Sequence, residues 1–348
     1  MSFRRHPKRV FCLGAVVLGL MTILFCGALL AQPFSLTSLI QKSDVIVVGA
    51  VRTVHQTGTT EVRVGAERLS ATNFQAEVQV DRILKGACPE SLAIVRFLIP
   101  KSAGFVGYTG VGAPSYRTLF LRKVENYFVF ADPAFPSLPG VSHVGLPAFS
   151  DVISGVINEL SQVLASQKTT EMDKLEAIFG VQSVPAPDAT KVLRAQLDGS
   201  PAVRAAAIAA LIERNDLSAL VAAQELLMNP PPQTPNYLLN NIASAIARGI
   251  RDEGAIPVLN TLLRSRDIAT RRAASDALRK TGSTRALSAL AKALNDSDSE
   301  VRYYAVIGLA EITNQPEWRP LMDDFKAHEN KFLQRVSKIP PERDPEAG

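Results

Sequence analysis

Ser200–Leu211 reads SPAVRAAAIAAL, Asp267–Leu278 reads DIATRRAASDAL, and Asp298–Leu309 reads DSEVRYYAVIGL. The three segments align residue for residue. Each begins with a residue that can cap a helix, carries alanine at a matched site, and ends in leucine. A fourth, degenerate copy runs from Pro235 to Ile246. The matched position near the start of each copy recurs after 35, 32 and 31 residues, so the sequence predicts a repeated helical unit.

Each copy is followed by a second helical pattern, which makes the unit a helix, a turn and a helix. These second patterns are Leu217–Leu227, Ala255–Leu263, Arg285–Leu294 and Trp318–Phe325. One such pair of helices cannot bury its own apolar face, so successive units must stack on one another. The D/S-x-x-V-R start, the alanine-rich first helix and the step of 31–35 residues resemble HEAT repeats of the short bacterial kind.

The resemblance to HEAT repeats implies an all-α solenoid over residues 171–338. A fainter unit at Thr170–Leu197 is expected to cap its N-terminal end, and Lys326–Lys338 is expected to form a closing helix before a disordered tail at 339–348. The proline-rich segment Asn229–Pro235 is expected to bend or widen the array, because proline cannot continue a helix.

Residues 34–150 carry strand patterns instead. Asp44–Val54 (DVIVVGAVRTV) is rich in β-branched residues, as is typical of a strand buried on both faces, and Gly49 within it indicates a bulge. Apolar and polar residues alternate from Phe74 to Asp81, and Glu125-Asn126 joins two further strands. The whole chain is therefore predicted to be an α+β multidomain protein: a small barrel- or sandwich-like β-rich domain, a connecting helix or linker at 151–170, and the solenoid.

The β-rich segments also resemble a known module. Ser43–Val51, Glu77–Gly86 and Tyr127–Asp132, in that order, resemble the OB-like barrel of netrin and metalloproteinase-inhibitor modules. The inhibitors act through an N-terminal cysteine and a disulfide framework, and this chain has neither. A protease-inhibitor-like function is therefore only an alternative.

Residues 1–31 are predicted to direct export. Met1–Arg9 is basic, and Val10–Leu30 follows with 21 residues and no charge. This order is typical of a secretory signal peptide, yet the apolar run also reaches the ~20 residues that span a bilayer. The segment is either a cleaved signal peptide or an uncleaved membrane anchor at residues 10–30. In both cases the rest of the chain is expected to be periplasmic or extracellular, with membrane contact only through this segment.

Charge and reactive side chains point away from nucleic acid and from catalysis. The formal net charge is +5, but beyond residue 31 the chain has 34 Lys+Arg against 33 Asp+Glu, so no nucleic-acid partner is expected. Ser142 lacks the spacing of a nucleophile elbow, and Cys88 is expected to be a small half-buried residue. The histidines, which lack ligand partners at metal spacing, are His6, His55, His143 and His328. We therefore predict no enzyme, cofactor or metal site.

Three groups of residues are candidates for interactions. Lys101–Ser115 is rich in glycine but lacks the features of a phosphate loop, so only its Phe105 and Tyr108 are candidate ligand contacts. Residues 248–285 hold nine Lys+Arg against four Asp+Glu. The arginines expected to line one face and bind an acidic partner are Arg251, Arg264, Arg266 and Arg272. The arginines expected to form a structural ladder with acids of the adjacent repeat are Arg204, Arg271 and Arg302.

These observations favour an exported, non-catalytic scaffold whose solenoid surface binds an unknown protein or peptide. The alternative is an enzyme accessory, because the solenoid is similar to HEAT-repeat proteins that assist the attachment of bilin chromophores. Those proteins act in the cytoplasm, so the predicted export argues against that role.

Overall fold

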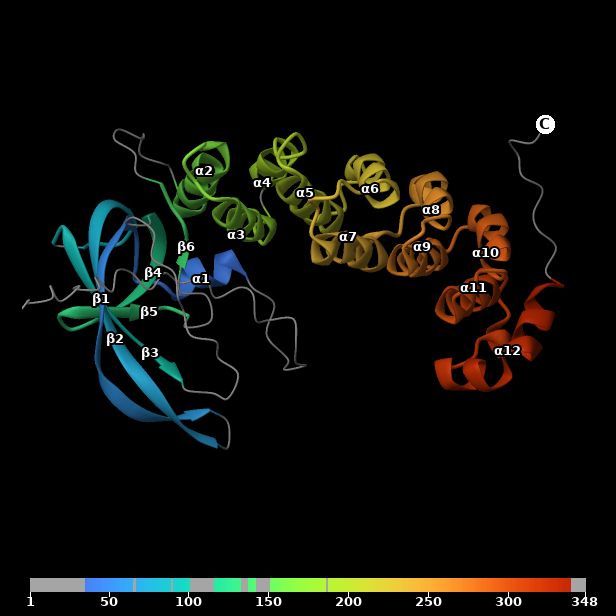
Figure 1. Cartoon of the computed structure of the whole chain (residues 1–348), viewed down its shortest axis with the longest axis horizontal. Coiled ribbons are helices and arrows are strands. Elements are labelled where there is room, and N and C mark those ends of the chain that lie inside the picture. The colour runs from blue at the N-terminus through green and yellow to red at the C-terminus, as the bar shows by residue number, and fades with distance from the viewer. Residues whose placement is uncertain are drawn as a thin grey trace, which may run out of the picture. The chain divides into compact units, whose positions relative to one another are not determined.

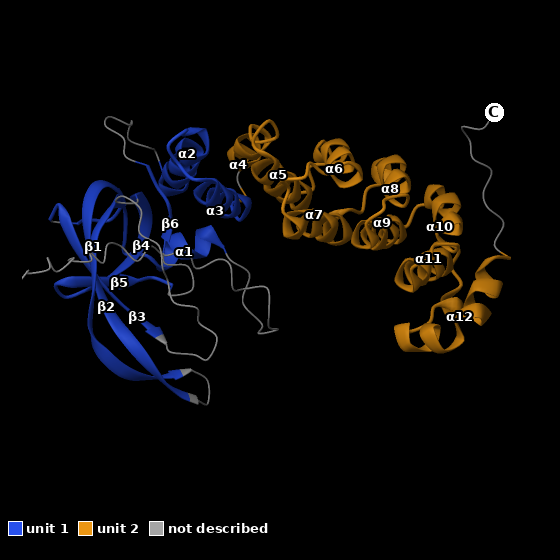
Figure 2. Cartoon of the chain, in the orientation of Figure 1, with its two compact units in different colours: residues 1–184 blue, residues 185–348 orange. Residues whose placement is uncertain are grey.

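The computed structural model describes residues 35–64, 67–88, 90–100, 116–132, 137–141, 151–185 and 187–338. These fall into two compact units, of which the first ends at Val184 and the second begins at Pro185 (Figure 2). Within the described ranges, no helix is long and apolar enough to cross a membrane. The predicted signal or anchor at 1–31 and the predicted tail at 339–348 lie outside these ranges.

The first unit is a β-barrel with helices on one side (Figure 1). Its elements are α1 (Leu36–Lys42), β1 (Val45–Val64), β2 (Glu67–Lys85), β3 (Leu92–Pro100), β4 (Tyr116–Val124), β5 (Tyr127–Phe130), β6 (Ser137–Pro139), α2 (Val152–Ala165) and α3 (Glu171–Gln182). The strand order is β1-β2-β3-β5-β4-β6, and β1 also pairs with β4, which closes the first five strands into a ring. The sequence predicts either a barrel or a sandwich, and a closed ring of strands is a barrel. The resemblance to netrin modules stays a prediction.

Strand β1 explains why the barrel forms at this point in the chain. Val45, Val47 and Val51 face the barrel core, while Ile46 and Val48 are fully buried on the opposite face. The predicted burial of both faces is therefore confirmed for Val45–Val51, whereas Asp44, Arg52 and Thr53 of the predicted segment are exposed. The register of β1 against β2 shifts between Val48 and Gly49, as predicted for a bulge. A Cβ atom at Gly49 would lie 2.2 Å from the carbonyl oxygen of Gln79, so only glycine fits there.

Helices α2 and α3 belong to the barrel unit, which differs from their predicted places in the linker and in the solenoid cap. Arg117 of β4 donates to Glu176 of α3 at 2.7 Å and to Asp173 at 3.4 Å, and both Arg117 and Glu176 are buried. Burial raises the pKa of Glu176, and the charge of Arg117 opposes that rise. A buried charge requires a partner, so this ion pair fixes α3 to the barrel.

Helix α2 is held to the barrel in the same way. Arg82 of β2 forms an ion pair with Glu159 of α2, whose side chain is only 1% exposed. The Glu159 carboxylate also accepts the backbone N–H of Val141 at 2.8 Å. Sequence patterns showed these acids as ordinary helical residues, because nothing local reveals the arginine that faces each of them.

The second unit is the predicted all-α solenoid. Its elements are α4 (Pro187–Arg194), α5 (Pro201–Glu213), α6 (Ala219–Met228), α7 (Asn236–Gly249), η1 (Glu253–Ala255), α8 (Ile256–Leu262), α9 (Ile268–Lys280), η2 (Thr284–Ala286), α10 (Leu287–Ala293), α11 (Ser299–Ile312), η3 (Pro316–Trp318) and α12 (Met322–Val336). Helices α5, α7, α9 and α11 stack side by side in one layer, and α6, α8 and α10 form the other (Figure 1). Helix α5 packs directly on α7, so Asn229–Pro235 does not separate them.

The predicted helix starts are confirmed by their caps. The side chains of Ser200, Asp267 and Asp298 accept backbone N–H groups of the first turns of α5, α9 and α11. At the C-terminal end, the sequence predicts a pair of helices at Trp318–Phe325 and Lys326–Lys338. Two helical segments, together labelled α12, cover Met322–Val336 and meet at a kink at His328, whose backbone angles are non-helical; the break is therefore close to the expected one, while Trp318 lies in η3.

Candidate functional site

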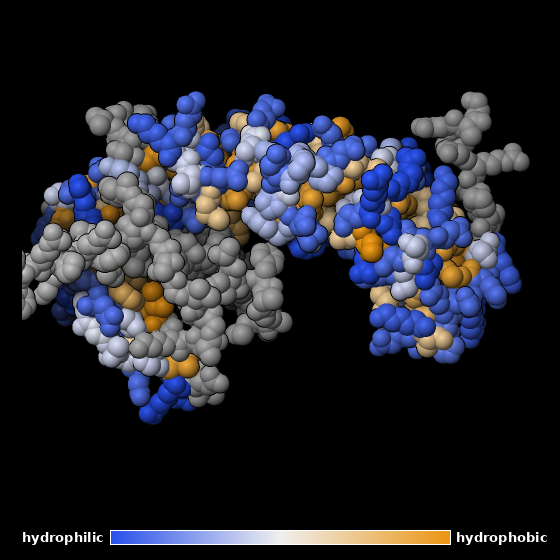
Figure 3. All heavy atoms as spheres, viewed as in Figure 1, coloured by the Kyte–Doolittle hydropathy of each residue, from blue (hydrophilic) through white to orange (hydrophobic). Residues whose placement is uncertain are grey.

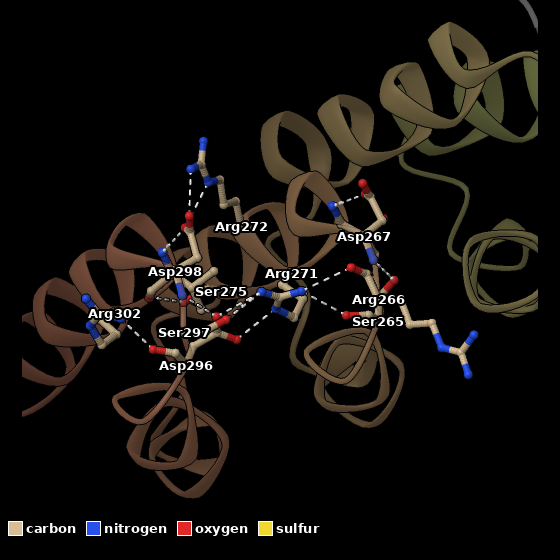
Figure 4. A network of polar contacts seen from close by, with 12 residues as sticks. Ser265, Arg266, Asp267, Arg271, Arg272, Ser275, Asp296, Ser297, Asp298 and Arg302 are labelled. Atoms are coloured by element: carbon tan, nitrogen blue, oxygen red, sulfur yellow. Dashed lines mark hydrogen bonds and ion pairs between the residues drawn. The ribbon is translucent and has the colours of Figure 1, made fainter.

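A network of charged side chains joins the repeats of α9 and α11 (Figure 4). Arg271 of α9 donates through Nε and Nη2 to the carboxylate of Asp296, at 2.8 and 3.1 Å. The Arg271 and Asp296 side chains are 12% and 11% exposed. Arg271 Nη1 also donates to the carbonyl oxygens of Ser265 and Arg266, at 3.1 and 3.3 Å. The guanidinium group of Arg271 therefore joins the loop before α9 to the loop before α11.

Asp296 is held from both sides, because Arg302 of α11 donates to its carbonyl oxygen at 2.6 Å. Arg302 also forms an ion pair with Glu329 of α12. Arg271 and Arg302 thus make the predicted contacts between successive repeats.

Arg204 departs from the predicted ladder. Its partner is Glu225 of α6, at 2.7 Å, which belongs to the same repeat. The position that corresponds to Asp296 holds Gln233, and the position that corresponds to Arg271 holds Leu239. Within the described part of the chain, the buried Nε of Arg204 has no hydrogen-bond partner. The ladder is therefore interrupted at the second repeat.

Arg272, which is predicted to bind an acidic partner, forms ion pairs within the junction between α9 and α11. Its guanidinium donates to both carboxylate oxygens of Asp298, at 2.9 and 2.7 Å, and pairs with Glu300 at 2.7 Å. Figure 4 shows Arg272 and Arg266 pointing in opposite directions. The hydrogen bond from Arg272 lowers the pKa of Asp298 to about 2.

The Asp298→Asn variant is expected to be less sensitive to acid than the unmodified protein. A depressed pKa stabilises the fold above the ordinary value of 3.8, and this contribution is lost as the pH falls through about 2. Asparagine retains the helix cap but not the charge. Unfolding in urea, measured at a series of acidic pH values, should show the difference between the proteins shrinking as the pH falls. Asp188→Asn, at an exposed carboxylate, is the control, and an equal change in that variant would contradict the assignment to Asp298.

The remaining predicted arginines do not share one face. Arg251 lies in the loop that joins α7 to α8 and donates to the carbonyl oxygen of Ile250 at 2.8 Å. Arg264 and Arg266 lie in the loop that joins α8 to α9. Because α8 runs back antiparallel to α7, these two loops lie at opposite ends of the helices. The structure therefore places only Arg264 and Arg266 together, while Phe105 and Tyr108 lie outside the described residues.

Two apolar side chains that the sequence analysis missed lie at the same helix ends as Arg264 and Arg266. Tyr237 is the second residue of α7 and is 53% exposed, and Ile268 is the first residue of α9 and is 47% exposed. Ile268 stands where other copies of the repeat have Pro201 or Ser299, and Tyr237 stands where they have Ala202 or Glu300.

The residues that the sequence singles out for metal or nucleophile chemistry lie partly in the described ranges. No group of three or more His, Cys, Asp or Glu there lies in a position to hold a metal ion. His55 and His328 are exposed, and Cys88 is half-buried, as expected, and forms no disulfide within the described residues. His6, Ser142 and His143 lie outside these ranges.

Comparison with known proteins identifies the repeat. Residues 233–310 match the family model for HEAT repeats, which confirms the HEAT-like domain. No curated protein sequence matches the chain. Two crystal structures of engineered proteins are similar at 20% identity and a TM-score of 0.34. The aligned regions cover 52% of this chain and 93% of the first protein, and 53% of this chain and 56% of the second.

Proposed function

Because the C-terminal unit is a HEAT-like solenoid, we propose that this chain is an exported, non-catalytic scaffold that binds another protein on the solenoid surface. Solenoids of this kind offer extended surfaces, because each repeat contacts only its neighbours and leaves its remaining faces exposed. The observation that carries the proposal is that large apolar side chains remain exposed along this repeat array. Val221 of α6 is 69% exposed, in addition to Tyr237 and Ile268.

Most arginines of the solenoid have a structural role. Most arginines of α5–α11 form ion pairs with acids of the same unit, so their charges stabilise the stacked helices. The export of the protein is supported by the basic, then apolar, order of residues 1–31.

Site-specific photo-crosslinking of the full chain in its native cells tests the binding role. A photoreactive phenylalanine analogue would replace Val221 or Tyr237 in the solenoid, and Ile83 or Leu98 in the barrel unit as matched exposed controls. We expect the solenoid positions to crosslink to one defined protein, and the barrel positions not to. Crosslinks only from the barrel positions would move the function to the first unit, and none from any position would contradict protein binding.

Export is tested separately. Alkaline phosphatase fused to the C-terminus of the full chain is active only outside the cytoplasm, where its disulfides form. Full activity supports export, whereas an inactive but intact fusion contradicts it.

A further inference from the structure

We propose that the partner is bound through an acidic peptide segment that also carries apolar side chains, on a surface made by Tyr237, Arg264, Arg266 and Ile268. This surface is called the α7–α9 edge below. The inference rests on the proposed protein-binding function and names the chemistry of the partner.

The arginines of the α7–α9 edge differ from most other arginines of the solenoid. Arg204, Arg248, Arg271, Arg272, Arg279 and Arg302 all pair with carboxylates. Arg264 and Arg266 are exposed, and no carboxylate in the described ranges pairs with either of them. A carboxylate of a partner would accept paired hydrogen bonds from either guanidinium group.

The backbone that carries these two arginines is fixed before any partner arrives. Ser265, which lies between them, is buried, and its hydroxyl accepts the backbone N–H of Asp267 at 3.2 Å. Arg271 donates to the carbonyl oxygens of both Ser265 and Arg266, as Figure 4 shows. A fixed backbone lowers the entropic cost of binding, because only the two arginine side chains must become ordered.

Apolar surface lies next to this charge. Helices α7 and α9 pack together and run in the same direction, so their first turns lie at the same end, about 8–10 Å apart by ordinary helix packing. Tyr237 and Ile268 occupy those first turns and are each about half exposed. Figure 3 shows apolar surface exposed over α7 and α9 among hydrophilic neighbours. Tyrosine and arginine together are typical of the residues that dominate binding energy at protein interfaces.

The edge therefore suits a peptide in which acidic residues alternate with large apolar ones. The carboxylates would contact Arg264 and Arg266, and the apolar side chains would cover Tyr237 and Ile268. The first turns of α7 and α9 also carry the positive ends of their helix dipoles, which add a small attraction for carboxylates.

Fluorescence anisotropy with the full chain tests this inference. The probe is a labelled glutamate-rich peptide that carries two leucines, compared with one in which lysine replaces every glutamate and one in which serine replaces the leucines. We expect the acidic leucine peptide to bind best. We expect about a tenfold loss of affinity in the R264E/R266E variant and a similar loss in Y237S/I268S. The control R251E/R285E makes the same charge change at exposed positions at the other end of the helices.

The outcomes separate the possibilities. If R251E/R285E lowers the affinity for the acidic leucine peptide as much as R264E/R266E does, the attraction is nonspecific and the inference is overturned. The absence of binding up to about 1 mM peptide would also overturn it. Tighter binding of a single-stranded oligonucleotide than of the acidic peptide would also overturn it. Circular dichroism of each variant verifies its fold. If R264E/R266E retains the crosslink from Val221, the scaffold function stands and the assignment of the binding site to the α7–α9 edge is wrong. If no solenoid position crosslinks, both the scaffold function and that assignment are wrong.

Discussion

Replacing Arg117 with alanine is expected to lower the free energy of unfolding of the barrel unit by about 3–5 kcal/mol, because the change leaves a buried carboxylate without its cation. The Arg117 side chain is 4% exposed and that of Glu176 is 9% exposed, so water cannot replace the lost partner. Hydrogen exchange of the full chain measures the effect, since peptides from β4 and α3 should exchange much faster while those from the solenoid do not.

Two controls make the Arg117 experiment specific. Lys42→Ala removes an exposed cation that pairs with Asp132 at 3.4 Å, and should cost about 0–1 kcal/mol. The loss in Arg117→Ala should also shrink at acidic pH, because the raised pKa of Glu176 lets that carboxyl take up a proton and lose its charge. A loss no larger than that of Lys42→Ala would show that the pair is not desolvated.

Replacing Arg271 with alanine is expected to destabilise the solenoid by about 3–5 kcal/mol, since its nearly buried partner Asp296 loses the pairing cation. The carbonyl oxygens of Ser265 and Arg266 also lose a donor. Trp318 is the only tryptophan in the sequence and lies after α11, so its fluorescence during urea unfolding reports on this unit.

The matched control for Arg271 is Lys191→Ala, which breaks an ion pair between side chains that are 79% and 70% exposed. That variant should unfold with an almost unchanged midpoint. Arg271→Lys should restore little of the lost stability. A single ammonium group cannot replace the planar guanidinium, which binds the Asp296 carboxylate and two carbonyl oxygens at once. Full recovery by lysine would mean that charge alone, without geometry, holds the junction.

The solenoid was predictable because residues close together in the sequence define each repeat. Each copy starts with a cap such as Asp267 or Asp298 and repeats alanine and leucine at fixed places, and the cap hydrogen bonds are present in the structure. The barrel was predictable in outline for a similar reason, since the β-branched run in β1 leaves no polar face.

The roles of charged residues were less predictable, because they depend on contacts between distant segments. Glu159 and Glu176 read as surface acids until Arg82 and Arg117 are placed opposite them. The only hint in the sequence is an arginine within or beside an apolar strand. The ion pairs of Arg272 were missed for the same reason, since its partners lie 26 and 28 positions further along the chain.

The interruption of the arginine ladder has a mechanical consequence. The junction of α9 with α11 is tied by Arg271 and Arg272, and by the Ser275 hydroxyl, which donates to the carbonyl oxygen of Val301 at 3.0 Å. Helix α7 carries leucine at the ladder position, and its ion pair with α5 uses the exposed Arg248. A tension along the solenoid should therefore stretch the junctions at α7 first. Although Lys280 of α9 donates to the carbonyl oxygen of Ala247 in α7 at 2.6 Å, we expect the repeats from α9 onward to resist extension more than the repeats before them.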